Sequence, residues 1–131
     1  MITALDSSVL LDVLTNDRTH ADASERLLRR AMHEGRIIAC ECVLAEIYPA
    51  LGSESRFNEF LSEMQLEYEP MSREAALLGG QCYERYLRRG GTARRVLPDF
   101  LIGAHARLQS DRLLARDRGY LRDYFSQLRL L

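Results

Sequence analysis

The chain has 131 residues, of which 47% are hydrophobic, and its formal net charge is −1. This length and apolar content suit one domain with its own core, so we expect a single domain over residues 1–131 without a linker. No apolar run is long enough to cross a bilayer, and residues 1–6 lack the basic start and long apolar segment of a signal peptide. We therefore expect a cytoplasmic protein without a membrane anchor.

Charge is distributed unevenly along the chain. Residues 1–84 contain 7 arginines and 15 acidic residues, whereas residues 85–131 contain 11 arginines and 4 aspartates. Clustered arginines can bind the phosphates of a polyanion, and a solvated arginine-rich surface is the alternative. Lysine is absent from the chain. Its absence argues against P-loop nucleotide binding and other lysine-dependent phosphoryl transfer.

The chain opens with a pattern typical of a strand followed by a helix. Residues 2–5 are a short apolar run, and Asp6, Ser7 and Ser8 precede apolar residues at helical spacing. A serine could cap this helix, which would leave Asp6 available at the carboxyl end of the strand, where open α/β sheets bind ligands. Residues 19–34 then predict an amphipathic helix.

Residues 36–40 predict a second buried strand, and residues 42–51 predict a helix that Pro49 kinks or ends. This helix carries Glu46 among apolar neighbours. A buried carboxylate is costly without a partner, so Glu46 either occupies a polar cleft or lies on a narrow exposed stripe.

The rest of the chain continues to alternate. It predicts helices at 54–64, 72–89 and after Pro98, a weak strand at 66–70, a strand at 111–115 and an edge strand at 125–131. This alternation predicts an α/β fold with a mainly parallel central sheet of four to five strands and helices on both faces.

Four acids fall at the ends of apolar elements. Asp6, Glu46 and Asp117 follow the predicted strands, and Asp99 stands at the start of the helix after Pro98. A helix cap is the alternative for Asp99, and a turn cap is the alternative for Asp117. If the strands are parallel neighbours, the four carboxylates share one cleft and repel one another unless a divalent cation binds. Oxygen ligands suit Mg²⁺ or Mn²⁺, which can activate water against a phosphodiester.

The segments around these acids resemble the four acidic motifs of PIN domains, especially those of VapC-type ribonuclease toxins. The segments are residues 6–12, 44–48, 97–106 and 113–120, and they occur in the family's order over essentially the whole chain. The resemblance implies a PIN-like three-layer sandwich and Mg²⁺- or Mn²⁺-dependent cleavage of RNA. It also implies a cognate antitoxin that occludes the site, and a homodimer.

Residue by residue, the resemblance assigns Asp6 and Asp99 as leading metal ligands, with Glu46 and Asp117 as ligands or water-orienting groups. Weaker candidates are Ser8, Arg94, Arg95 and Arg116. Ala115 departs from the family, which often has Ser or Thr two residues before the last acid. His105 lies about 240° round the helix from Asp99, so we do not count it as catalytic.

The sequence also allows two alternative functions. A phosphatase with Asp6 as nucleophile would need a lysine and a second acid two residues later, and the chain has neither. A non-catalytic PIN-fold module that binds RNA or protein has no need of four clustered acids. DNA remains an alternative substrate.

Overall fold

The computed structural model describes residues 1–92, 96–116, 119–125 and 128–131. The elements are, in order, β1 (Ile2–Leu5), α1 (Ser7–Leu14), α2 (Ala21–Glu34), β2 (Arg36–Ala39), α3 (Glu41–Leu51), α4 (Glu54–Met64), β3 (Leu66–Tyr68), α5 (Arg73–Arg88), α6 (Leu97–Gln109), β4 (Arg112–Leu114) and α7 (Gly119–Tyr124). This order agrees with the predicted alternation. Within the described ranges, no helix is both long and apolar enough to span a membrane.

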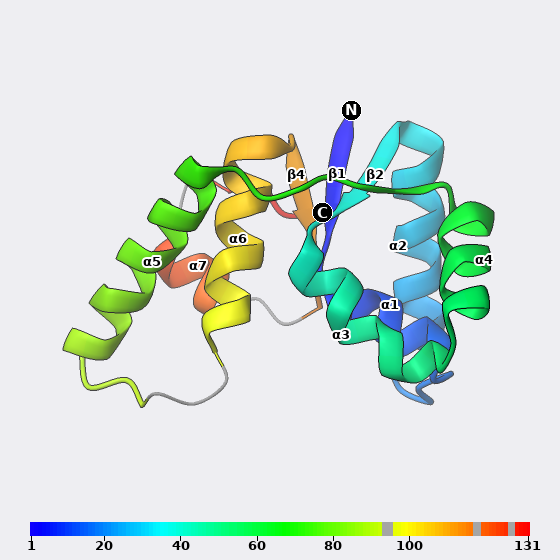
Figure 1. Ribbon diagram of the computed structural model, residues 1–131, viewed down its shortest axis with the longest axis horizontal. Coiled ribbons are helices and arrows are strands. Elements are labelled where there is room, and N and C mark those ends of the chain that lie inside the picture. Colours follow the sequence, from blue (N-terminus) through cyan, green and yellow to red (C-terminus); the bar gives the residue numbers. More distant parts are fainter. Residues whose placement is uncertain (93–95, 117–118, 126–127) are drawn as a thin grey trace.

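The strands form one parallel sheet in the order β3-β2-β1-β4. β1 is central, because Ala4 pairs with Ile38 of β2 on one side and with Leu113 of β4 on the other. These three residues are buried, as expected for a parallel sheet covered on both faces. Figure 1 shows α2 and α4 on one side of the sheet and α5, α6 and α7 on the other. The predicted α/β sandwich with a four-stranded parallel sheet is confirmed.

One charged side chain is buried within this sheet. Arg112 begins β4 beside Thr3 of β1, and its side chain is only 2% exposed. Its Nε donates a hydrogen bond to Thr3 Oγ1 at 2.9 Å, and its Nη2 forms an ion pair with Glu34 Oε2 at 2.6 Å. Two hydrogen bonds lower the pKa of the Glu34 carboxyl. The bond from Arg30 has the larger effect, and the bond from Arg112 has the smaller one. The buried charge is therefore compensated, and it ties β4 to β1 and to the end of α2.

Pro49 does not end α3, contrary to one of the two predicted outcomes. The helix continues through Pro49 to Leu51 and ends where Gly52 adopts a left-handed φ of 82°. The Gly52 N–H donates to the carbonyl of Tyr48 at 2.9 Å, which closes the last turn. Because Pro49 lies in this last turn, the loss of its N–H does not prevent the helix from closing there.

The predicted edge strand at residues 125–131 is reduced to a single bridge. Leu130 pairs in parallel with Leu113 of β4. The Leu113 N–H donates to Arg129 O at 2.9 Å, and the Leu131 N–H donates to Leu113 O at 3.0 Å. In the part of the chain that the structure describes, this segment covers the outer side of β4 without forming a strand.

The opposite edge of the sheet is β3. This strand is three residues long, and the side chains of Glu67 and Tyr68 are exposed. Arg36 of the neighbouring β2 forms an exposed ion pair with Glu67 at 2.9 Å. Pro70 follows the strand two positions after its end. The edge is therefore short, charged and closely followed by a proline.

Close packing of α5 against α6 explains one of two adjacent glycines. A Cβ at Gly79 would lie 2.9 Å from Leu101 Cδ2 and 3.3 Å from Phe100 O, whereas a Cβ at Gly80 would meet nothing within 4 Å. The Phe100 ring is fully buried and contacts the rings of Tyr83, Tyr86 and Tyr124. The glycine pair therefore marks a close helix approach at Gly79.

Alanine at these two glycines should have different effects on stability. Gly80→Ala gains helix propensity without a clash, so the free energy of unfolding should rise by up to about 1 kcal/mol. Gly79→Ala must displace Leu101, and overpacking costs about 1–3 kcal/mol. Urea denaturation should therefore find Gly79→Ala less stable than Gly80→Ala by at least about 1 kcal/mol. Equal stability of the two variants would contradict the close approach.

His105 is buried in α6 and bonds to the segment that follows β3. It is 1% exposed, and its Nε2 lies 2.9 Å from the carbonyl oxygen of Glu69, which follows β3. Since that oxygen can only accept, Nε2 carries the hydrogen. Burial lowers the pKa of His105 below its usual value, and the bond to Glu69 opposes this only in part.

This burial makes folding stability depend on pH. Because the unfolded chain binds a proton at His105 more readily than the folded chain, the contribution of His105 is full above about pH 6.5 and is lost as pH falls below it. His105→Gln, which can still donate to Glu69, should therefore lose less stability than wild type between pH 7.5 and 5.5 in urea titrations. His33→Gln, at an exposed position of α2, is the control. An unchanged pH slope in His105→Gln would contradict the argument.

Candidate active site

Asp6 lies directly after the central strand. Its backbone N–H donates to Leu114 O of β4 at 2.9 Å, which continues the sheet bonding to the end of β1. Asp6 occupies the N-cap position of α1 in an extended conformation, and its side chain makes no capping hydrogen bond. The Asp6 carboxylate instead accepts a hydrogen bond from Ser8 Oγ at 2.6 Å. It is half-buried at the carboxyl end of the sheet.

The two serines that begin α1 bind two different acids. Ser8 donates to Asp6, and Ser7 Oγ donates to Glu46 Oε1 of α3 at 3.2 Å. The prediction that one of these serines caps the helix is therefore wrong, because Asp6 itself occupies the cap position. Ser7 was not among the predicted site residues. The sequence feature that could have indicated its role is the pair Ser7 and Ser8, two adjacent hydroxyl residues directly after the acid that ends β1.

Glu46 combines an exposed position with a perturbed carboxyl group. The residue is exposed, but Ala45, Tyr48 and Pro49 are exposed too, so it lies on a broad exposed face of α3 and not on the narrow stripe of that prediction. Its carboxylate contacts Ser7. Its pKa is raised chiefly by partial desolvation and further by the negative charge of Asp6, while the bond from Ser7 opposes the shift. Asp6 and Glu46 are therefore close enough to influence each other electrostatically.

Asp99 lies in the first turn of α6, which begins at Leu97 with Pro98 in its first turn. It is half-buried, and α6 packs against β1, β4 and α3. In Figure 1, β1 and β4 run downward, so their carboxyl ends are at the bottom of the view. The first turn of α6 lies at the bottom as well.

Predicted site residues Asp117, Arg94 and Arg95 lie outside the described residues.

The predicted site acids that the structure describes are not among the residues whose ligand atoms cluster most tightly. Among the described residues, the His, Asp and Glu side chains whose ligand atoms lie within 4.8 Å of one another are Asp12, Asp17 and His20. Asp17 in this group already accepts bonds from the backbone and the ring of His20, each at 2.8 Å. Asp6, Glu46 and Asp99 do not meet this distance criterion, although Asp6 is near enough to Glu46 to raise its pKa. Their oxygen donors are nevertheless the type that Mg²⁺ and Mn²⁺ prefer.

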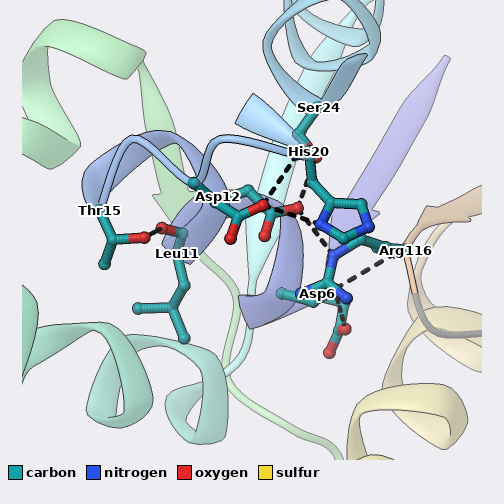
Figure 2. A network of polar contacts seen from close by, with 9 residues as sticks. Asp6, Leu11, Asp12, Thr15, His20, Ser24 and Arg116 are labelled. Atoms are coloured by element: carbon teal, nitrogen blue, oxygen red, sulfur yellow. Dashed lines mark hydrogen bonds and ion pairs between the residues drawn. The ribbon is translucent and has the colours of Figure 1, made fainter. Parts of the chain in front are cut away.

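Arg116 follows Ala115 after β4, and Figure 2 shows its guanidinium beside Asp12 of α1. Arg116 Nε donates to Asp12 Oδ2 at 2.9 Å, and Ser24 Oγ donates to the same oxygen at 2.7 Å. The Arg116 backbone N–H donates to Ser8 Oγ at 3.2 Å. Asp12 was not among the predicted site residues. The signal was present, because Asp12 is an acid inside an apolar helical run, as Glu46 is.

The comparisons with known proteins agree with this architecture. The sequence matches the PIN domain family model over residues 3–125. VapBC2 from Rickettsia felis bound to a DNA fragment from its promoter is 21% identical, with a TM-score of 0.76 over 100% of this chain and 98% of that chain. VapBC-1 from nontypeable Haemophilus influenzae is 17% identical, with a TM-score of 0.73 over 100% of this chain and 97% of that chain.

A third solved structure is VapC20 of Mycobacterium tuberculosis, described as a sarcin–ricin loop cleaving toxin. It is 15% identical, with a TM-score of 0.62 over 97% of this chain and 98% of that chain. None of the curated proteins compared with the chain matches it. The family model spans nearly all of the sequence, and the likeness in fold extends over the whole chain. The chain therefore belongs to the PIN domain family.

Proposed function

We propose that this PIN domain is a Mg²⁺-dependent endoribonuclease, also active with Mn²⁺, and the toxin of a type II toxin–antitoxin pair. The observation that carries the proposal is the pair of serine hydrogen bonds that hold Asp6 and Glu46 at the carboxyl end of the parallel sheet. Binding alone gives no reason to hold two carboxylates near each other against their repulsion, whereas a cation would relieve that repulsion.

The residues that would hold the cation are Asp6, Glu46, Asp99 and Asp117. A cation bound there would neutralise charge on the scissile phosphodiester and lower the pKa of a bound water. Ser8 restricts the orientation of the Asp6 carboxylate, and Ser7 restricts that of Glu46. Half-burial of Asp6 and Asp99 limits the water that competes for their oxygens. Together these contacts pre-orient ligands for a hard cation.

The proposed biological context is supported by the structural neighbours. One of them is a toxin–antitoxin complex from Klebsiella pneumoniae, 14% identical with a TM-score of 0.67, and another is DNA-bound VapBC from Salmonella typhimurium. We propose the same kind of antitoxin partner for this chain, with RNA as substrate, a homodimeric state and a cytoplasmic location. The named activity of VapC20 on the sarcin–ricin loop supports RNA rather than DNA as the substrate class.

A non-catalytic PIN-fold module that binds RNA or protein is the second candidate. Ala115 favours it, because this residue is 2% exposed and offers no hydroxyl where PIN domains often have Ser or Thr. Without that hydroxyl, a water or Asp117 would have one hydrogen-bond partner fewer. The two candidates differ in whether the bound nucleic acid is cut.

The test of the nuclease proposal is cleavage of total cellular RNA by purified protein with Mg²⁺ or Mn²⁺. Discrete fragments should appear and should vanish with EDTA. Asp6→Asn and Asp99→Asn should each lower the cleavage rate by at least about 100-fold, because loss of a ligand should cost at least as much as loss of a residue that supports one. Asp22→Asn, an exposed aspartate in the first turn of α2, is the control for Asp99→Asn and should leave cleavage unchanged.

Metal binding, read by the Mn²⁺-dependent shift in melting temperature, separates the two candidates. Folded protein that binds Mn²⁺ through Asp6 but cuts neither RNA pools nor single-stranded DNA would contradict the nuclease proposal. That result would favour the binding module and direct attention to Ala115.

A further inference from the structure

A buried carboxylate links α1 to the segment after β4. The Asp12 side chain is 4% exposed, and its Oδ2 accepts hydrogen bonds from Ser24 of α2 and Arg116. Figure 2 shows these two donors reaching Asp12 from different elements. A carboxylate removed from water is costly unless donors replace the lost solvent, so both contacts compensate for the burial of Asp12.

Arg116 makes both a side-chain contact and a backbone contact with α1. Its guanidinium binds Asp12, and its backbone N–H donates to Ser8 Oγ at 3.2 Å. Ser8 Oγ in turn donates its single proton to Asp6 Oδ2 at 2.6 Å. Since a serine hydroxyl has one proton, Ser8 must accept from Arg116 while it donates to Asp6. The three groups therefore form a directed chain from the Arg116 backbone to the Asp6 carboxylate.

We propose that Arg116 is a positioning residue for Asp6. Its ion pair with Asp12 holds the Arg116 backbone in place. The Arg116 backbone N–H then holds the Ser8 hydroxyl, which orients the Asp6 carboxylate. The inference rests on the proposed function only in treating Asp6 as a metal ligand. Without the ion pair, the backbone N–H can move away from Ser8. The Ser8 hydroxyl then turns more freely, and Asp6 loses its fixed orientation.

The same contacts assign Arg116 a different role from a phosphate-binding arginine. Its side chain is 42% exposed, yet its Nε points to the buried Asp12. A residue that contacts RNA phosphate would affect mainly substrate binding. A residue that positions a ligand would affect metal affinity in the absence of RNA.

The test measures Mn²⁺ affinity by isothermal titration calorimetry without RNA. Arg116→Gln and Asp12→Asn should each weaken Mn²⁺ binding by about 10-fold, the usual effect of losing a residue that supports a ligand. The double variant Arg116→Gln/Asp12→Asn should bind Mn²⁺ no more weakly than the weaker-binding single variant does, because both changes break the same ion pair. Arg116→Lys, which keeps the charge, should recover part of the affinity. Arg29→Gln, which breaks the exposed pair with Glu25, is the control and should bind as wild type does.

Ser8→Ala provides a second route if Asp12→Asn does not fold. It breaks the chain next to Asp6, so adding Arg116→Gln to Ser8→Ala should weaken Mn²⁺ binding no further. In cleavage assays, Arg116→Gln should lower kcat at fixed Mn²⁺ without raising the KM for RNA.

Two results would overturn the proposal. One is wild-type Mn²⁺ affinity in folded Arg116→Gln with a lowered melting temperature, which would make the ion pair purely structural. The other is unchanged Mn²⁺ affinity in Asp6→Asn, which would remove the ligand that Arg116 is proposed to position. Failure of the wild type to cut RNA would instead contradict the nuclease proposal alone, because the affinity comparison does not need cleavage.

Discussion

Parallel pairing of β1 with β2 and β4 is the constraint on which the rest of the structure depends. Because all the strands run in one direction, their carboxyl ends meet at one edge of the sheet, and α1 and α3 begin there. The bond from Asp6 N–H to Leu114 O extends this pairing to the first candidate ligand. The apolar pairing in the core thus determines where the polar groups gather, although it involves none of their side chains.

The fold and the general position of three acids could be predicted from the sequence. The short apolar runs at β1, β2 and β4 are distinctive because buried parallel strands carry few polar residues. Asp6 follows the first run directly, and Asp99 follows Pro98 at a helix start, so local patterns alone placed both. Glu46 stood out as an acid among apolar neighbours, and the structure gives it Ser7 as a partner and a raised pKa.

The contacts that fix these acids were harder to predict, because they join residues far apart in the chain. Asp12 and Arg116 are 104 positions apart, and Arg112 and Glu34 meet only once β4 lies beside β1. The excess of arginine after residue 84 suggested phosphate binding. At least two of those arginines, however, neutralise acids from the first part of the chain. Part of the charge asymmetry therefore serves folding, and charge counts alone cannot separate this role from RNA binding.

The two edges of the sheet have a consequence for solubility. An exposed strand edge can pair with another chain and start aggregation. The outer side of β4 is partly covered by the bridge from Leu130, while β3 is short, carries the Arg36–Glu67 ion pair and is followed by Pro70. Neither edge therefore offers a long, flat, apolar template. Substitutions that extend β3 or neutralise Glu67 should be more damaging to the yield of soluble protein than their small effect on the folded monomer would suggest.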